Sequence, residues 1–355
     1  MTIIDAKPTT LEIKEIPVEG YEKVIEAVDE VSGLHAIIAV HNTNLGPALG
    51  GTRFMSYPTR EEALDDVLRL SRGMTYKSAI LEIGRGGGKS VIIGDPKTQK
   101  TEALFRSFAQ ALNALGGLYI CAEDMGTTPE DMAFIARYTD HVLATSSPES
   151  SGDPSPFTAW GVFRSIQAVC KHLWGDDSVE GRTVAIQGLG AVGEKLMDTL
   201  FWNQAKLVVC DIDPEKAKAL GCKYGAKVVP CEEIYKADCD IFAPCAIGGI
   251  LNDSTIPLLK CRAVVGAANN QLLRPEHGDQ LAEKGILYAP DYVVNTGGIM
   301  NISVETHEDG YNPAKACSLV NMVYANLLRV IAISEERRIP TYLAAEELAE
   351  QKFCR

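Results

Sequence analysis

Two lysines, twelve positions apart, are the side chains in this sequence best suited to chemistry. Lys77 ends the sequence GMTYK at 73–77, and Lys89 ends the glycine cluster GGGK at 86–89. One ammonium group can hold a substrate carboxylate, and a lysine whose pKa is lowered by burial and a neighbouring charge can act as a base. The simpler interpretation is a pair of solvated surface lysines. Apolar neighbours such as Met74, and the glycines before Lys89, weigh against that interpretation, and these residues alone support the two interpretations about equally.

The glycine cluster before Lys89 invites comparison with a phosphate-binding loop, GxxxxGK[ST]. That motif needs a glycine where this sequence has Ile83, and a helix after the lysine. The residues that follow Lys89, SVIIGDP, form a strand pattern instead. The sequence therefore argues against a nucleoside triphosphatase.

An acidic residue offers a third reactive group. Asp124, in CAEDMG at 121–126, directly follows an apolar run that predicts a buried strand. A carboxylate at the end of such a strand lies where α/β proteins bind ligands, and it can exchange protons or balance a lysine. Taken alone, an acid at such a position is more often an ordinary loop acid or a helix cap.

A dinucleotide fingerprint occurs a hundred residues later. Gly188, Gly190 and Gly193 fit GxGxxG between a predicted strand at 183–187 and a predicted helix at 192–201. The backbone around Ala191 and Val192 would present free N–H groups to a pyrophosphate. Asp211 ends the next predicted strand, where its carboxylate would bind ribose hydroxyls and repel a 2′-phosphate, which favours NAD.

These groups need a scaffold, and the 355 residues favour two domains. Strands and helices alternate from about 20 to 145, and a βαβ rhythm from 183 predicts a parallel sheet with helices on both faces. A Ser/Pro-rich stretch at 145–156 is the expected linker. We expect an α/β protein with domains at 1–147 and 148–327, and helices in 328–355 that pack back on the first.

Composition excludes several other classes. A net charge of −13 argues against nucleic acid or an anionic membrane as a partner. The N-terminus shows no secretory signal, no apolar run is long enough for a bilayer, and ten cysteines without CxxC pairs indicate reduced thiols in a cytoplasmic protein. Six histidines without ligand spacing predict no metal site.

The motifs together resemble the glutamate/leucine/phenylalanine/valine dehydrogenase family, closest to its leucine dehydrogenase branch. They are, in order, GPALGGTR at 46–53, GMTYK, GGGK, AEDMGT at 122–127, SGDPSP at 151–156, GLGAVG at 188–193, GAANNQL at 266–272 and APDYVVNTGG at 289–298. The resemblance implies NAD-dependent, reversible conversion of an L-amino acid to its 2-oxo acid and ammonia. It also implies a substrate-binding and oligomerisation domain, a Rossmann-type domain, an active site in the cleft between them, and a homo-oligomer.

Residue roles follow from the same resemblance. It implies that Lys77 binds the substrate carboxylate, Lys89 is the base and Asp124 carries protons. The remaining matched positions would help to fix the substrate (Gly50, Gly51, Met74, Asn295) or lie near the nicotinamide and its ribose (Ala246, Asn269).

The sequence specifies the amino acid substrate less closely than it specifies the reaction. The glutamate branch has a lysine where this sequence has Leu49, and a substrate carboxylate buried against leucine would be unpaired. With Ala122 two residues before Asp124, the pocket is expected to take leucine, valine or isoleucine, with phenylalanine or tryptophan as the alternative. A third hypothesis is a catalytically silent NAD-binding regulatory protein.

Overall fold

The computed structural model describes residues 10–143, 151–306 and 310–354. The chain forms two compact units: Met1–Gly152 together with Lys352–Arg355, and Asp153–Gln351. The boundary expected between 147 and 148, and much of the expected linker, lie in 144–150, outside the described residues. Of the C-terminal helices expected to pack on the first domain, only the last four residues group with the first unit.

The first unit contains a six-stranded mixed sheet in the order β1-β2-β3-β5-β4-β6. β1 to β3 and β5 pair antiparallel, whereas β4 runs parallel to both β5 and β6. The strands are β1 (Glu12–Glu15), β2 (Lys23–Asp29), β3 (Leu34–Asn42), β4 (Ala48–Met55), β5 (Gly86–Ile93) and β6 (Tyr119–Glu123). β4 lies between β5 and β6 and runs parallel to both, so the three strands end at the same edge of the sheet.

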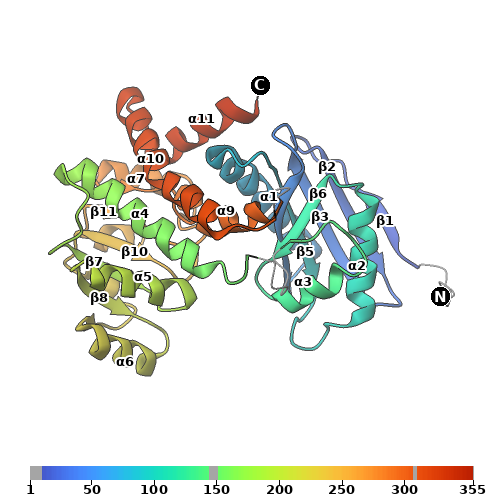
Figure 1. Cartoon of the computed structure of the whole chain (residues 1–355), viewed down its shortest axis with the longest axis horizontal. Coiled ribbons are helices and arrows are strands. Elements are labelled where there is room, and N and C mark those ends of the chain that lie inside the picture. The colour runs from blue at the N-terminus through green and yellow to red at the C-terminus, as the bar shows by residue number, and fades with distance from the viewer. Residues whose placement is uncertain (1–9, 144–150, 307–309, 355) are drawn as a thin grey trace. The chain divides into compact units, whose positions relative to one another are not determined.

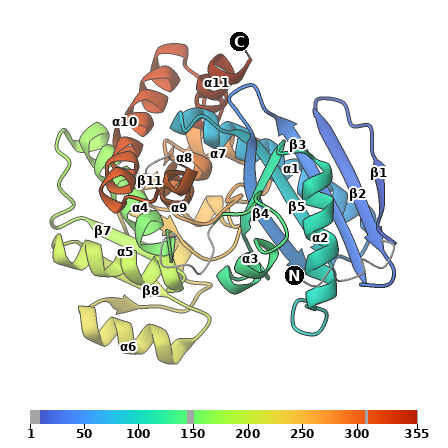
Figure 2. The same ribbon diagram turned by 45° about the vertical axis from the view of Figure 1, so that its right-hand side comes forward.

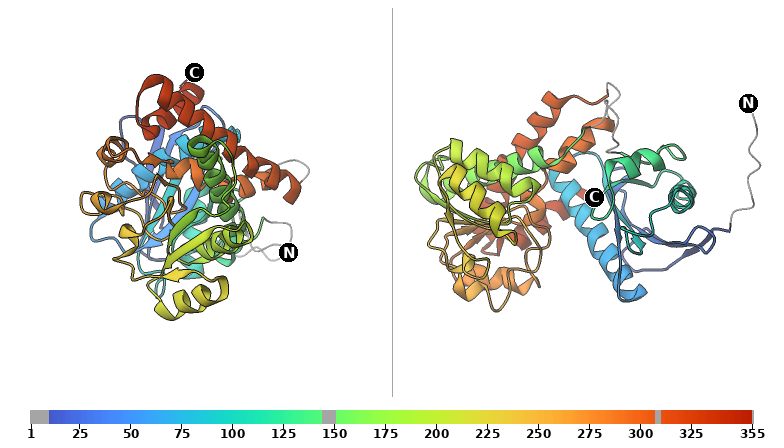
Figure 3. Two further views of the ribbon diagram at one scale, coloured as in Figure 1. Left: turned by 90° about the vertical axis from the view of Figure 1, so that its left-hand side faces the viewer. Right: turned by 90° about the horizontal axis from the view of Figure 1, so that it is seen from below.

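Helices cover both faces of this sheet. α1 (Arg60–Leu81) packs on one face, where Ala63 and Val67 join a cluster with Ile37 and Val91. α2 (Glu102–Ala114) and α3 (Pro129–Ile135) cover the other face, and Figures 2 and 3 show α1 and α2 on opposite sides of the strands. Thr101 caps α2, and Thr128 caps α3 with a reciprocal bond to Asp131.

Two elements are longer than their sequence patterns predict. The helical spacing of apolar residues covers 60–72, and α1 continues beyond it to Leu81 and carries the whole GMTYK sequence. Packing against the sheet offsets the cost of about 1 kcal/mol for a glycine inside a helix. The strand predicted at 91–94 begins at Gly86, so the glycine cluster and Lys89 lie inside β5.

The second unit is built on a parallel sheet in the order β12-β11-β10-β7-β8-β9. This is the doubly wound arrangement in which the strand order reverses beside the first strand, and Figure 1 shows α4 and α5 along the sheet. The strands are β7 (Thr183–Gln187), β8 (Lys206–Cys210), β9 (Lys227–Val228), β10 (Ile241–Pro244), β11 (Ala263–Val264) and β12 (Leu287–Tyr288). The predicted α/β class with a Rossmann-type domain is confirmed.

Helices surround the second sheet and form the C-terminal part of the chain. They are α4 (Ser155–Trp174), α5 (Ala191–Trp202), α6 (Pro214–Tyr224), α7 (Glu276–Glu283), α8 (Asp291–Val294), α9 (Gly297–Ser303), α10 (Pro313–Arg337) and α11 (Thr341–Phe353). Short 3₁₀ turns occupy Ile234–Lys236, Ile256–Leu258 and Val304–Thr306. α10 is long and apolar enough to cross a membrane by length and composition alone, and one side of it packs against α4 and α9.

The ten cysteines are all free thiols. Cys121, Cys170 and Cys210, which lie in apolar runs of the sequence, are buried. Cys222, Cys317 and Cys354 are exposed.

Candidate active site

Close packing of glycines brings Lys89 and Asp124 together. Gly51 lies on β4 beside Ala122 of β6. Side chains alternate between the two faces of a sheet, and the register of β4 with β5 places Gly51 and Lys89 on the same face. A Cβ atom on Gly51 would lie 2.7 Å from Asp124 Cβ and 3.0 Å from Lys89 Nζ. A residue larger than glycine would therefore push against both groups.

Lys89 and Asp124 form a buried ion pair. Lys89 Nζ lies 3.1 Å from Asp124 Oδ2, and their side chains are 7% and 22% exposed. Arg53 donates from Nε to the same oxygen over 2.9 Å, and from Nη1 to Asp66 over 2.8 Å. Burial alone would raise the pKa of Asp124, but the charges of Lys89 and Arg53 outweigh it and lower the pKa. Asp124 is thus a carboxylate at neutral pH, and Lys89 Nζ lies within hydrogen-bond distance of it.

A buried hydroxyl network fixes the backbone under this pair. Tyr119 on β6 donates to the Gly50 carbonyl over 2.9 Å, and its oxygen lies 3.1 Å from Ser90 Oγ. Ser90 in turn donates to Thr52 Oγ1 over 2.9 Å. Burial raises the pKa of Tyr119 well above its usual range, so the phenol stays protonated. The network ties β4, β5 and β6 together where their glycines leave few side chains to pack.

Met74 reaches this region from α1, and Lys77 stands three residues further along the same face of that helix. Lys77 is half-buried in the last turns of α1, and a Cβ atom on Gly50 would lie 3.4 Å from Met74 Cγ. A Cβ atom on Gly87 would lie 2.0 Å from the backbone nitrogen of Thr75. The glycines of β5 therefore let the helix that carries Lys77 pack directly on the strand that carries Lys89.

Leu49 and Ala122 supply apolar surface next to these groups. Leu49 is 1% exposed and pairs with Gly87 of β5, and Ala122 is 5% exposed beside Gly51. Leu49 stands two positions before Gly51 on β4, so both lie on the face that carries Lys89. A substrate side chain that packs on this face would therefore meet no positive charge at position 49.

The second unit places the glycine fingerprint at the point where the strand order reverses. Gly188 follows β7 with φ +90°, and a Cβ atom there would lie 2.7 Å from Ala246 Cβ at the end of β10. Gly190 precedes α5, and a Cβ atom on Gly193 would lie 2.0 Å from the Gly188 carbonyl oxygen. The loop thus presents the N-terminus of α5, including the amides of Ala191 and Val192, at the site where this fold binds dinucleotides.

Asp211 is tied to this loop directly. Its Oδ2 accepts a hydrogen bond from the Leu189 amide over 2.6 Å, and its Oδ1 accepts one from the Asp213 amide over 2.9 Å. The carboxylate therefore orients the glycine loop, a contact that the sequence motif does not predict. It also lies at the end of β8, where an adenosine ribose would reach it.

Asn269 and Asn295 form a polar pair in the same unit. Asn295 Nδ2 donates to Asn269 Oδ1 over 2.7 Å and to the Ala267 carbonyl over 3.1 Å. Asn295 is 6% exposed, and among the described residues its Oδ1 accepts no hydrogen bond. A buried amide oxygen of this kind costs free energy unless a ligand or water donates to it. The predicted substrate-binding Asn295 thus belongs to the second unit, and the other predicted substrate and catalytic residues belong to the first.

Arg53 is the main residue whose role the sequence analysis did not assign. It lies in the quoted GPALGGTR motif, two positions after Gly51, and this spacing places both on one face of β4. It joins Asp124 to Asp66, which also accepts a hydrogen bond from Tyr57 over 2.8 Å. The alternation of side chains along β4 could have identified Arg53 from the sequence. Asp66 lies on α1, and only the folded structure shows that it meets Arg53.

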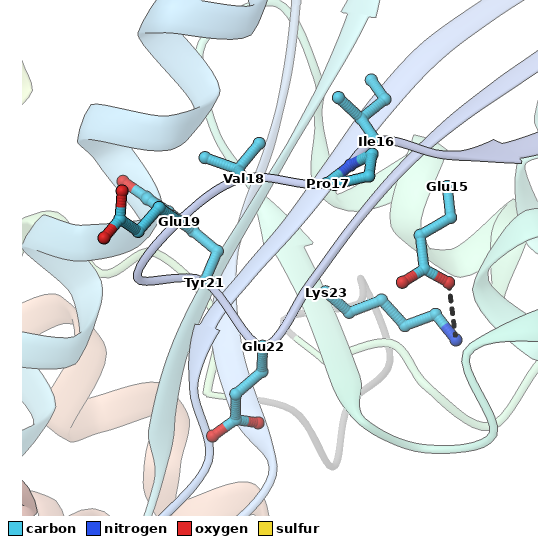
Figure 4. A pocket seen from close by; sticks show the side chains of 8 residues that line it. All are labelled: Glu15, Ile16, Pro17, Val18, Glu19, Tyr21, Glu22 and Lys23. Carbon is cyan, nitrogen blue, oxygen red and sulfur yellow. Dashed lines mark ion pairs between the residues drawn. The ribbon is translucent and has the colours of Figure 1, made fainter.

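A hollow of about 370 Å³ lies away from these residues, at the β1–β2 turn. It is lined by residues 15–19 and 21–23, and Figure 4 shows Glu15 and Lys23 paired at its edge. None of the predicted site residues lines it. Across the described residues, no group of three or more His, Cys, Asp or Glu side chains is placed to hold a metal ion.

Comparison with known proteins identifies the two units by family. The model of the Glu/Leu/Phe/Val dehydrogenase dimerisation domain matches residues 19–141. The model of the Glutamate/Leucine/Phenylalanine/Valine dehydrogenase domain matches residues 212–315. Together they cover more than half of the chain, including Lys77, Lys89, Asp124, Asn269 and Asn295.

Individual relatives agree with the family models. A leucine dehydrogenase of Geobacillus stearothermophilus is 51% identical over 94% of this chain and 90% of its own. A phenylalanine dehydrogenase of Caldalkalibacillus thermarum is 45% identical over 95% and 92%. Among solved structures, the L-tryptophan dehydrogenase of Nostoc punctiforme has a TM-score of 0.83 and 43% identity, over 94% of this chain and 96% of that one.

Proposed function

The chain belongs to the Glu/Leu/Phe/Val dehydrogenase family and is an amino acid dehydrogenase, and we propose that it oxidises leucine, valine or isoleucine with NAD. The products are the 2-oxo acid, ammonia and NADH, and the reaction is reversible. The observation that carries this proposal is the buried Lys89–Asp124 pair beside Gly51, in a chain that also holds a dinucleotide loop.

Each residue has a defined task in this reaction. Lys77 binds the substrate carboxylate, and Asn295 Oδ1, which accepts no hydrogen bond within the described chain, accepts one from the substrate amino group. Bound NAD supplies the acceptor for the hydride that leaves Cα. In its deprotonated form, Lys89 takes a proton from the water that attacks the resulting iminium carbon, and Asp124 passes protons on while ammonia leaves. Arg53 keeps Asp124 oriented and ionised through its bond to Oδ2.

Two features of the second unit favour NAD over its phosphorylated form. The Asp211 carboxylate would accept hydrogen bonds from ribose hydroxyls and repel a 2′-phosphate. Its bonds to the Leu189 and Asp213 amides hold it at the glycine loop. The loop itself suits a pyrophosphate, because Gly188 and Gly193 let β7 and α5 pack closely and Gly190, the N-cap of α5, carries no side chain over the helix N-terminus.

The pocket chemistry favours branched aliphatic side chains. Leu49 and Ala122 are nearly fully buried and uncharged, so a glutamate side chain would be left without a partner there. Aromatic substrates are the second candidate, because the chain is also similar to a phenylalanine and an L-tryptophan dehydrogenase.

We also infer a cytoplasmic homo-oligomer. The first unit matches a family model described as a dimerisation domain. The ten free thiols suit a reducing compartment. Size-exclusion chromatography with light scattering tests the oligomeric state.

The direct test is NADH formation at alkaline pH with leucine, valine, isoleucine, phenylalanine, tryptophan and glutamate. We expect the three aliphatic substrates to give the highest kcat/KM and glutamate none. A preference for the aromatic substrates would retain the reaction and overturn the pocket assignment. No turnover with any of them would leave a cofactor-binding protein without this activity.

Lys89→Ala tests the mechanism, with Lys97→Ala as the matched control on an exposed lysine. We expect Lys89→Ala to lower kcat by at least about 10²-fold, the lower end of what a general base contributes. Lys97→Ala should retain wild-type turnover. Unchanged turnover in Lys89→Ala would contradict the assignment of the base.

A further inference from the structure

The last residues of α11 pack on the first unit. Residues 341–351 of this helix group with the second unit, but Lys352–Arg355 group with the first. Phe353 is 5% exposed, and its ring packs against side chains of the first unit.

Phe353 completes an aromatic cluster on α1 and β3. Its ring packs edge-on against Tyr76, with centroids 5.2 Å apart, and against His41 at 6.4 Å. Tyr21 packs on the other side of His41 at 4.9 Å. Arg72 covers Tyr76 at 4.4 Å and donates to its hydroxyl over 2.8 Å, so Tyr76 is held from several directions.

Polar contacts fix the same C-terminal residues at two further points. The Phe353 carbonyl accepts a hydrogen bond from Asn44 Nδ2 over 2.8 Å, in the segment that leads into β4. Lys352 forms an ion pair with Glu82, the C-cap residue of α1. Residues 352–353 thus join the end of α1 to the segment before the glycines of β4.

His41 connects these C-terminal contacts to β5, the strand that carries Lys89. It is the extra residue at the irregularity between β3 and β5, where Val40 pairs with Gly88 and Asn42 with Gly87. Its Nδ1 lies 2.8 Å from Thr75 Oγ1, and Thr75 is the residue that packs on Gly87. Burial lowers the pKa of His41 to about 4, so this contact is made by a neutral imidazole at physiological pH.

We propose that Phe353 is a positioning residue for substrate binding: it locks the last turns of α1 and thereby holds Lys77 in place. Lys77 follows Tyr76 directly, so a helix held at Tyr76 and at Glu82 cannot rotate or slide at Lys77. This inference rests on the proposed role of Lys77, although the locking of α1 can be measured without it. Phe353 itself has no contact with the reacting groups.

The test compares Phe353→Ala with wild type in two independent measurements. The first is amide hydrogen exchange of residues 73–82, which we expect to become at least about tenfold faster when the ring is removed. The second is steady-state kinetics with leucine, where KM for the amino acid should rise about tenfold while kcat and KM for NAD change little. A merely structural role would not produce this split.

Three further variants keep the result interpretable. Phe353→Leu, which retains apolar volume, should restore most of the wild-type KM. Lys352→Ala should act in the same direction more weakly, and it serves where Phe353→Ala does not fold. Trp202→Ala, at a 73% exposed aromatic side chain of the other unit, should leave both measurements unchanged.

The outcomes separate this inference from the proposed function. Wild-type exchange and KM in Phe353→Ala would overturn the positioning role while amino acid oxidation stands. An equal rise in the KM values for leucine and NAD would also overturn it, because that is general damage. If wild type oxidises no amino acid, the proposed function fails, and the exchange rates alone decide whether Phe353 locks α1.

Discussion

Gly51 offers a sharp test of the catalytic geometry, because one methyl group there meets both catalytic candidates. In Gly51→Ala the new Cβ would lie 2.7 Å from Asp124 Cβ, 2.7 Å from the Glu123 carbonyl oxygen and 3.0 Å from Lys89 Nζ. The two shortest contacts are about 0.7 Å inside the ordinary van der Waals distance of 3.4 Å. The Glu123 oxygen is backbone, so the strand end that carries Asp124 has to move.

The size of the effect follows from these contacts. A displacement approaching 1 Å at reacting groups costs about 10²-fold in rate, so we expect kcat to fall between about 10- and 100-fold. Overpacking of a close-packed site costs about 1–3 kcal/mol of folding free energy. This corresponds to a decrease in Tm of about 3–10 °C for a unit of this size.

The assays are leucine-dependent NADH formation and thermal unfolding. Gly73→Ala is the control for stability, because it adds the same methyl group inside α1 where no atom lies within 4 Å. It should raise the free energy of unfolding by about 0.5–1 kcal/mol. Wild-type kcat and Tm in Gly51→Ala would refute the close approach of Lys89, Asp124 and β4 on which the mechanism depends.

Three further predictions concern cofactor, substrate and pH. Asp211→Ser should raise KM for NAD about tenfold and improve the use of the 2′-phosphorylated cofactor, because it removes both the ribose acceptor and the repulsion; kcat/KM with each cofactor measures this. Leu49→Lys should introduce measurable glutamate oxidation and lower Tm, since an unpaired ammonium replaces a side chain that is 1% exposed. Glu26 accepts two hydrogen bonds from Arg60, which lower its pKa from 4.5 to about 2. A lowered pKa stabilises the fold above the unfolded value, so up to about 3 kcal/mol should be lost between about pH 5 and 2. Glu26→Gln should flatten that dependence in urea denaturation at about pH 5 and 3; an unchanged slope would contradict the pairing.

Much of the second unit could be predicted from local sequence. The fingerprint at Gly188 to Gly193 lies between a strand and a helix as expected, and the alternating pattern predicts a parallel sheet. Such signals are local, because glycines at fixed spacing and apolar runs of strand length dictate backbone geometry directly. The bond from Leu189 to Asp211 spans β7 and β8, and no spacing rule reveals it.

The first unit shows where local signals end. Gly73 lies inside α1, because packing of the helix on the sheet outweighs the preference of one residue. The glycines before Lys89 form the start of β5, where Thr75 needs the space that a side chain would fill. In both places a tertiary contact decides the local conformation.

The sequence by itself determined the family, the α/β class and the identity of the reactive residues, because those depend on residue types at short spacings. Only the tertiary structure decided which charges meet. Arg53 and Asp66 come to Asp124 from a strand and a helix, and Phe353 comes to Tyr76 from the far end of the chain. Ion pairs and ring contacts act over a few ångströms in space, whatever the separation along the chain, so they exist only once the sheet and α1 have packed.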